Sequence, residues 1–175
     1  MTIRNAQPGD ARAIATIHVR AWQTAYRGIV PSSYLSDLSI DQREQAWRHR
    51  LERGGSTVLL AEEGDHILGW ISAGRSRDVD AGPATGELYA LYVTPEHWRR
   101  GVGRQLWHDS GRRLSDAGFT EATLWVMRDN APARAFYGSH GFADDASIQK
   151  TVKLGGVDLL EVRMRSHIRV KGPSA

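Results

Sequence analysis

The segment whose residue types point most directly to chemistry spans residues 91–104, with the sequence LYVTPEHWRRGVGR. An apolar strand pattern leads into a basic loop (residues 94–101), and a helix pattern follows. The first turn of a helix presents N–H groups without an intrahelical partner and the positive end of the helix dipole. The glycines let a bulky anion approach the backbone, and Arg99, Arg100 and Arg104 add positive charge. The segment predicts a site for a phosphate or pyrophosphate; an ordinary solvated loop is the alternative.

Two common nucleotide-binding motifs do not fit this segment. A P-loop requires Gly-Lys followed by Ser or Thr, and here Arg104 follows Gly103. A dinucleotide fingerprint needs a longer glycine pattern inside a parallel sheet. The predicted anion site therefore belongs to another class.

Length and composition indicate one folded domain. The chain has 175 residues, of which 41% are hydrophobic and 25% charged. These fractions are close to the average of globular proteins. We expect a single domain over residues 1–168 and a disordered tail over residues 169–175. With no cysteine, the chain has no disulfide, thiolate nucleophile or cysteine-ligated metal.

The net charge, the histidine spacing and the hydropathy pattern argue against nucleic-acid, metal and membrane binding. The net charge is +3, too small to indicate nucleic-acid binding. The seven histidines are scattered without ligand spacing, so we expect no metal. No apolar run is long enough for a membrane helix, and residues 1–10 do not resemble a signal peptide. A cytoplasmic protein that binds neither nucleic acid nor membrane is expected.

Hydrophobic periodicity and turn residues predict the elements that position the basic loop. Strands are expected at residues 2–6, 57–61, 66–72, 87–93, 121–127, 142–152 and 157–164. Helices are expected near residues 8–25, 32–38, 41–51, 101–118 and 130–141. This order predicts an α+β fold with a mixed sheet covered by helices, and its hairpins exclude a purely parallel, doubly wound sheet.

The basic loop resembles the acetyl-CoA pyrophosphate loop of the GNAT superfamily of N-acetyltransferases. The family pattern is Gln or Arg, two residues, Gly, one residue, then Gly or Ala. Trp98 stands at the first position here, and Gly101 and Gly103 match the glycines. The sequence NAPARAFY at residues 130–137 is similar to the family's asparagine-to-tyrosine helix. The likeness spans about residues 2–165 and implies about seven mostly antiparallel strands, splayed between strands 4 and 5, with about four flanking helices.

The resemblance implies acetyl-CoA as cosubstrate and assigns residues to it. The backbone of Leu91 and Val93 would bind the pantetheine arm and polarise the thioester carbonyl. Asn130 would also reach that arm. The pyrophosphate would lie on the backbone amides of Arg99, Arg100, Gly101, Val102, Gly103 and Arg104.

Two residues are expected to move protons. Tyr137 matches the family tyrosine that faces the CoA sulfur and would act as the acid; a core tyrosine packed beside Phe136 is the alternative. Glu87 would act through water as the base, since alternation predicts residues 87, 89, 91 and 93 on one strand face. A glutamate in a salt bridge is its alternative. Asp78 and Asp80 could instead attract a cationic substrate.

Three aromatic residues are expected near the acceptor. Trp22, Tyr26 and Tyr34 lie where this family lines its acceptor site, and an aromatic wall holds apolar or cationic groups. Core packing is the alternative for Trp22. At the other end of the chain, Arg163, Arg165, Arg169 and Lys171 are expected to form a solvated strand end.

We interpret the sequence as an N-acetyltransferase in which a primary amine attacks the thioester of acetyl-CoA. The sequence does not decide whether the acceptor is a small molecule or a peptide, or which acyl chain length is preferred. It also does not decide whether the chain forms a homodimer, as relatives often do. A non-catalytic acyl-CoA-binding sensor of the same fold is the alternative.

Overall fold

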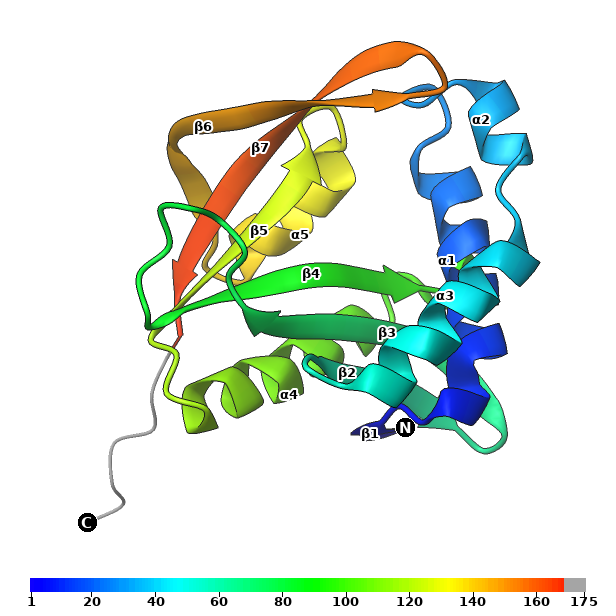
Figure 1. Ribbon diagram of the computed structural model, residues 1–175, viewed down its shortest axis with the longest axis horizontal. Helices are drawn as coiled ribbons and strands as arrows, with labels where there is room; N and C mark the ends of the chain where they lie inside the picture. Colours follow the sequence, from blue (N-terminus) through cyan, green and yellow to red (C-terminus); the bar gives the residue numbers. More distant parts are fainter. Residues whose placement is uncertain (169–175) are drawn as a thin grey trace.

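The computed structural model describes residues 1–168, except the side chains of Ala146 and Ser147. The predicted tail, with Arg169 and Lys171, lies outside the described residues. The described strands form one seven-stranded sheet in the order β1-β2-β3-β4-β5-β7-β6 (Figure 1). They span Thr2–Asn5, Thr57–Glu63, His66–Arg75, Thr85–Val93, Glu121–Met127, Ala143–Leu154 and Val157–His167, from β1 to β7.

Five α-helices cover this sheet in the described chain, where about four were predicted. They are α1 (Ala11–Ala25), α2 (Ser32–Ser36), α3 (Ile40–Arg53), α4 (Val102–Asp116) and α5 (Ala131–Ser139). A cap separates α2 from α3, because the Ser39 side chain accepts a hydrogen bond from the Gln42 N–H. None of the described helices is both long and apolar enough to cross a bilayer.

Two apolar cores lie on opposite faces of the sheet. One packs α4 against β2–β5 and β7, around Leu59, Ile71, Leu106 and Leu124. The other packs α1 and α3 against β2 and β3, around Ile14, Trp47, Leu60 and Trp70. Consecutive residues of β2, Leu59 and Leu60, point into different cores, as strand alternation requires. The predicted α+β class with a mostly antiparallel sheet is confirmed.

The sheet opens between β4 and β5, its one parallel pair among the described strands. Thr85–Leu88 pair with Glu121–Leu124. Past Leu88 the two strands diverge, although β4 continues to Val93 and β5 to Met127 (Figure 1). The predicted splay between strands 4 and 5 is confirmed, and it leaves one edge of β4 without a neighbouring strand.

A β-bulge in β4 changes which residues share a face. Ser72 pairs with Ala90 and Ala73 with Leu88, so Tyr89 is an additional residue on β4. Leu88, Leu91 and Val93 all pack on the α4 side, and Ala90 lies with Tyr92 on the α1 and α3 side. The predicted shared face of residues 87, 89, 91 and 93 is therefore wrong, because strict alternation does not hold through a bulge.

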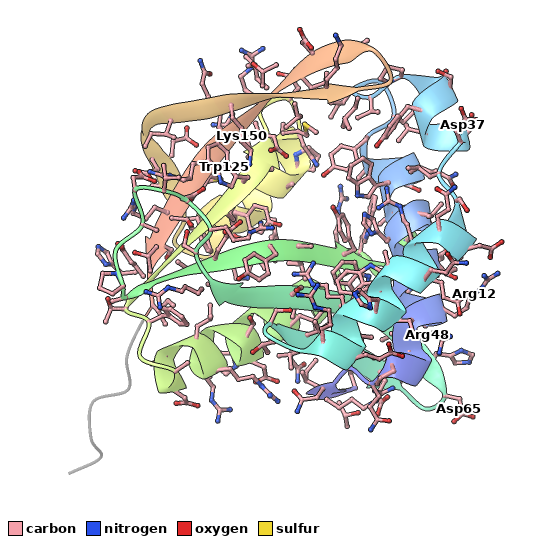
Figure 2. All side chains as sticks on the ribbon, in the orientation of Figure 1. Arg12, Asp37, Arg48, Asp65, Trp125 and Lys150 are labelled. Atoms are coloured by element: carbon pink, nitrogen blue, oxygen red, sulfur yellow. The ribbon has the colours of Figure 1, made fainter. Side chains whose placement is uncertain are left out.

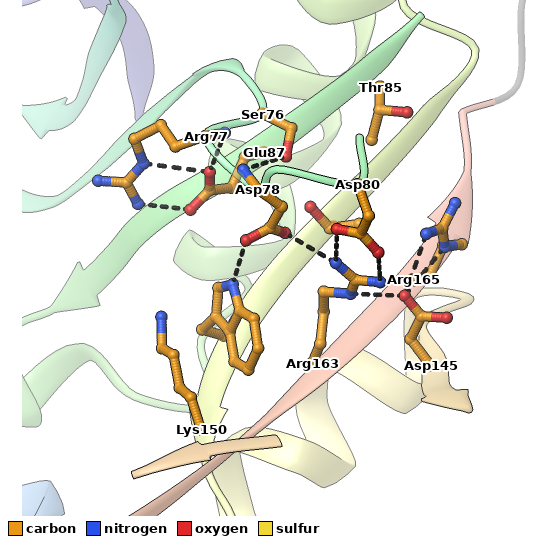
Figure 3. A network of polar contacts seen from close by, with 12 residues as sticks. Ser76, Arg77, Asp78, Asp80, Thr85, Glu87, Asp145, Lys150, Arg163 and Arg165 are labelled. Carbon is orange, nitrogen blue, oxygen red and sulfur yellow. Dashed lines mark hydrogen bonds and ion pairs between the residues drawn. The ribbon is translucent and has the colours of Figure 1, made fainter. Parts of the chain in front are cut away.

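A buried arginine fixes the loop between β3 and β4 to β7 (Figure 3). Arg163, 3% exposed, pairs with Asp80 through two hydrogen bonds of 2.7 Å, with Asp145 at 2.6 Å and with Asp78 at 3.3 Å. The Trp125 indole also donates to Asp78 at 3.0 Å. The expected solvated strand end is thus wrong for Arg163, because three carboxylates surround its guanidinium. Asp78 and Asp80 hold the loop rather than facing a substrate.

Replacing Arg163 with Met is expected to lower the free energy of unfolding by about 3 kcal/mol, because it leaves carboxylates packed together without their cation. Urea unfolding at neutral pH measures the change. Arg128→Met is the matched control, because the Arg128 side chain is 51% exposed and pairs with the exposed Asp129. Its expected loss is at most about 0.5 kcal/mol. Equal losses in the two variants would contradict the structural role of Arg163.

Candidate active site

A cavity of about 920 Å³ occupies the gap between the diverging strands β4 and β5. Its walls come from the end of α1, the second half of β4, residues 97–104, the middle of β5 and the first turns of α5. The site residues expected from sequence separate into two groups. The cavity is lined by Tyr26, Leu91, Val93, Arg99, Arg100, Gly101, Val102, Gly103, Arg104, Asn130 and Tyr137. Trp22, Tyr34 and Glu87 are outside that set.

The free edge of β4 supplies backbone donors to this cavity. Hydrogen bonding alternates along an antiparallel ladder, and the Thr94 N–H donates to the Leu68 carbonyl of β3 at 2.8 Å. Alternation therefore turns the N–H groups of Leu91 and Val93 away from β3, toward the space that β5 has left. Backbone donors in that position can bind an amide or stabilise a developing oxyanion.

Trp98, which replaces the usual first residue of the loop motif, fixes the loop to this edge. Its indole N–H donates to the Val93 carbonyl at 2.8 Å, while the side chain stays 40% exposed. The bond occupies the carbonyl of Val93 and leaves the Val93 N–H directed into the gap.

The N-terminus of α4 forms the anion-binding wall. Gly101 is the N-cap residue, with φ of 85°, and no side chain caps the helix. Arg99, with φ of 60°, is the one non-glycine residue at positive φ in the described chain. A Cβ atom on Gly103 would lie 3.3 Å from the Phe136 ring, so a larger residue would narrow the cavity at this point. Uncapped N–H groups, the helix dipole and three exposed arginines suit a pyrophosphate.

Asn130 joins the cavity through its position at the start of α5. Its Oδ1 accepts the Ala133 N–H at 3.2 Å. Asn130 is therefore the N-cap residue of α5. Because the oxygen is used by the cap, the amide NH₂ is the group of this side chain that can donate to a bound molecule.

Three phenol-bearing side chains meet in the cavity. Burial raises the pKa of Tyr137 and of Tyr26, and the neighbouring phenol of Tyr92 raises both further. Burial also raises the pKa of Tyr92, whose oxygen accepts the Trp22 indole N–H at 2.8 Å. All three phenols are therefore protonated at neutral pH and can donate a proton or a hydrogen bond.

Glu87 does not reach the cavity wall. It is 2% exposed, and its carboxylate accepts hydrogen bonds from Arg77, at 2.9 Å from the backbone N–H and 3.1 Å from Nε, with a further contact from Nη2 (Figure 3). The role of base stays a prediction for Glu87, and this pairing argues against it. Glu87 thus forms a salt bridge, which was the alternative to its role as base.

Trp22 and Tyr34, the other two residues expected at the acceptor site, do not line the cavity. Trp22 packs against Tyr26 with ring centroids 4.8 Å apart and bonds Tyr92, so it holds two lining phenols. Tyr34 lies under the β6–β7 turn, where a Cβ on Gly155 would come within 2.9 Å of the Tyr34 Cβ.

Sequence reasoning missed aromatic lining residues on both splayed strands, namely Tyr89 and Tyr92 on β4 and Trp125 on β5. Their aromatic character in two strands that flank the splay was the available signal. This signal does not distinguish a cavity wall from a packed core, because aromatic residues are equally typical of buried strands.

Glu161 on β7 is an acidic residue opposite Met127 of β5. Its carboxylate lies 3.4 Å from the Lys150 ammonium, which sits 3.9 Å above the centre of the Trp125 ring, and Figure 2 shows Lys150 beside Trp125. The negative charge of Glu161 adds, after burial and the neighbouring phenols, to the raised pKa of Tyr26. Glu161 itself is not among the residues that line the cavity. The described residues contain no group of three or more side chains that could hold a metal.

Comparison with known proteins decides the family. The model of the acetyltransferase (GNAT) family matches residues 16–142, which include the free edge of β4, the basic loop and α5. The chain belongs to the GNAT family. It is an acyltransferase, as the predicted resemblance implied.

Relatives and solved structures agree with this assignment. The chain is 32% identical to the N-acetyltransferase YuaI of Bacillus subtilis, over 93% of this chain and 90% of that protein. It is 28% identical to the L-amino acid N-acyltransferase MnaT of Escherichia coli, over 85% and 83% of the two chains. The structure of yncA from Salmonella typhimurium, solved with its cofactor acetyl-CoA, superposes with a TM-score of 0.72 at 25% identity, over 100% and 98% of the chains.

The raised phenol pKa values predict an alkaline transition. Burial raises the pKa of four of the five tyrosines, residues 26, 89, 92 and 137. The tyrosines of the unfolded chain ionise near pH 10. Burial of neutral phenols in the native protein therefore makes its full contribution to the free energy of unfolding below pH 10. That contribution is lost as pH rises through the raised pKa values of the native tyrosines. Absorbance at an ultraviolet wavelength specific for phenolate should show most tyrosines of the native protein ionising above the range of the unfolded protein. Overlapping native and unfolded titrations would contradict the buried placement.

Proposed function

We propose that this chain transfers the acetyl group of acetyl-CoA to a primary amine by direct attack of the amine on the thioester. The observation that carries the proposal is the free β4 edge beside an uncapped helix N-terminus, in one cavity. Backbone donors for an acyl group and donors for a pyrophosphate lie next to each other there. No observation on the described residues favours the non-catalytic sensor over the enzyme.

Acetyl-CoA supplies the thioester, and this chain supplies its binding groups. The N–H groups of residues 99–104, with the arginine side chains, would hold the pyrophosphate. Leu91 would hydrogen-bond the pantetheine arm, with the Asn130 amide as a second donor. The Val93 N–H would donate to the carbonyl oxygen as negative charge develops on it, which lowers the barrier to attack.

Proton transfer is assigned to Tyr137 and to a carboxylate on the acceptor side. An amine at neutral pH is mostly protonated and must lose a proton before it attacks. Tyr137, kept neutral by burial that raises its pKa, would donate to the departing thiolate. Glu161 would take the amine proton through water, because its side chain is 20% exposed and holds one ion pair, with Lys150 at 3.4 Å. The carboxylate of Glu87 is 2% exposed and accepts hydrogen bonds from two nitrogens of Arg77.

Acetyl-CoA is expected to raise the melting temperature of the protein. At a hundredfold excess over Kd, binding adds about 2.7 kcal/mol, a rise of about 5–10 °C for a domain of this size. Gly103→Val should abolish the rise, because its side chain meets the Phe136 ring at the cavity wall. Gly138→Ala, whose Cβ meets nothing within 4 Å, is the matched control and should keep it. A wild-type protein that neither acetyl-CoA nor free CoA stabilises would overturn the proposed function.

Three single variants test the proton-transfer roles, with thiol release from acetyl-CoA as the assay. Tyr137→Phe should lower kcat about a hundredfold with the KM for acetyl-CoA preserved, and Glu161→Gln should lower kcat about tenfold or more. Glu87→Gln should keep kcat within about threefold while lowering the free energy of unfolding, since it disrupts a structural pair. If Glu87→Gln loses all turnover while Glu161→Gln stays active, Glu87 and not Glu161 is the base. Acetyl-CoA binding without turnover of any amine would favour the sensor.

A further inference from the structure

The cavity is lined from both faces of the sheet, and the two faces differ in character. On the α4 face its walls include Leu91, Val93 and Tyr137, which pack against the core beneath α4. The first turn of α4 lines the cavity beside them. These groups are the ones proposed to bind acetyl-CoA and to protonate its thiolate. The acceptor amine is thus left with the opposite face, against which α1 and α3 pack.

Four half-buried aromatic side chains line the cavity on this opposite face. Tyr92 packs with the core of α1 and α3, and Tyr26 is the C-cap residue of α1. Tyr89 stacks against Arg50 of α3. Both neighbours of the fourth residue, Trp125, point into the α4 core, so strand alternation directs Trp125 to the other face. Tyr89 and Trp125 belong to the two strands that diverge, so their rings flank the gap.

The polar atoms of these two flanking side chains are already bonded within the protein. The Tyr89 hydroxyl donates to the Arg75 carbonyl at 2.6 Å, and the Trp125 indole N–H donates to Asp78 at 3.0 Å. Neither side chain therefore keeps a free hydrogen-bond donor for a bound molecule. What Tyr89 and Trp125 offer the cavity is ring surface, which suits an apolar, planar group.

No charged residue lines this face within the part of the chain that the structure describes. The charged lining residues are Arg99, Arg100 and Arg104 of the basic loop, at the cofactor end. Arg50, which stacks on Tyr89, is not among the lining residues. A carboxylate bound on this face would therefore lose its hydration without gaining a cation, which is unfavourable.

Aromatic rings distinguish an ammonium group from a carboxylate. The face of a ring is the negative part of its quadrupole, so it attracts a cation and repels an anion. The protein already shows this preference at both rings, where Lys150 lies 3.9 Å from the centre of Trp125 and Arg77 lies 4.3 Å from the centre of Tyr89. Each of these two cations is paired with a glutamate, so neither needs an anionic ligand. This face of the cavity suits an amine and disfavours a carboxylate.

We propose that the acceptor is an amine with an aromatic body and no carboxylate beside the amino group, and that Tyr89 and Trp125 contact this body. The inference rests on the proposed acetyl transfer and names its substrate class. In the reaction a C–N bond replaces the C–S bond of the thioester, and the proton that the amine loses balances the proton that the thiolate gains. Tyr89 and Trp125 touch none of the reacting atoms, so their rings act on the KM for the acceptor.

Acceptors that differ in one group test the substrate class. 2-Phenylethylamine is compared with phenylalanine, which adds the carboxylate, and with ethylamine, which lacks the ring, by thiol release from acetyl-CoA. The wild-type kcat/KM should be about tenfold or more higher for 2-phenylethylamine than for either of the others. Basicity does not explain a preference over phenylalanine, because an α-amino group has the lower pKa and more of its neutral, reactive form at neutral pH.

Two substitutions at one position isolate the contribution of a ring. Trp125→Leu removes the ring and Trp125→Phe keeps one, while both lose the hydrogen bond to Asp78. Trp125→Leu should raise the KM for 2-phenylethylamine about tenfold relative to Trp125→Phe, the value of one aromatic contact. The KM values for acetyl-CoA and for ethylamine should agree between the two within about threefold. Tyr89→Leu and Tyr89→Phe repeat the comparison on the other strand, in case a Trp125 variant does not fold.

The possible outcomes separate this inference from the proposed function. Equal KM values for 2-phenylethylamine in the Leu and Phe substitutions would overturn the role of the rings. A wild-type preference for phenylalanine or for ethylamine would overturn the substrate class. If acetyl-CoA raises the melting temperature but 2-phenylethylamine is not acetylated, this inference fails while the cofactor site stands. If acetyl-CoA does not bind, the proposed function itself fails.

Discussion

The separation of β4 from β5 is the constraint on which the site depends. A backbone N–H buried in a sheet ordinarily has a partner on the next strand. Here the parallel pairing ends at Leu88, and both strands continue apart. The donors of Leu91 and Val93 then face a cavity instead of a strand. The indole of Trp98 occupies the Val93 carbonyl, so the edge that remains is rich in donors.

The divergence is stable because each strand is held by different neighbours. β4 is fixed by β3 and by the core beneath α4, and β5 by β7 and the ion pairs around Arg163. The loop from β3 to β4 crosses between the two halves, and Asp78 and Asp80 attach it to β7. The gap is therefore held open by contacts on both of its sides, which suits a site that must keep backbone donors in place.

The bulge at Tyr89 determines which side chains meet in the cavity. Without it, Glu87 would lie on the same face as Leu91 and Val93. With it, Glu87 turns toward Arg77, whose guanidinium also stacks on the ring of Tyr89. One inserted residue thus moves a carboxylate out of the reaction space and brings an aromatic surface into it.

The sequence by itself predicted the class of fold and the residues of the basic loop and α5 that line the cavity. Gly101, Gly103, the arginines and the cap at Asn130 act through local backbone geometry, which follows from residues close together in the chain. The acceptor end was different. The pairing of Glu87 with Arg77, the burial of Arg163 and the pairing of Glu161 with Lys150 all depend on how strands and loops pack in three dimensions. Only tertiary packing decided them, because a strand's pattern gives neither its bulges nor the partners of its charged side chains.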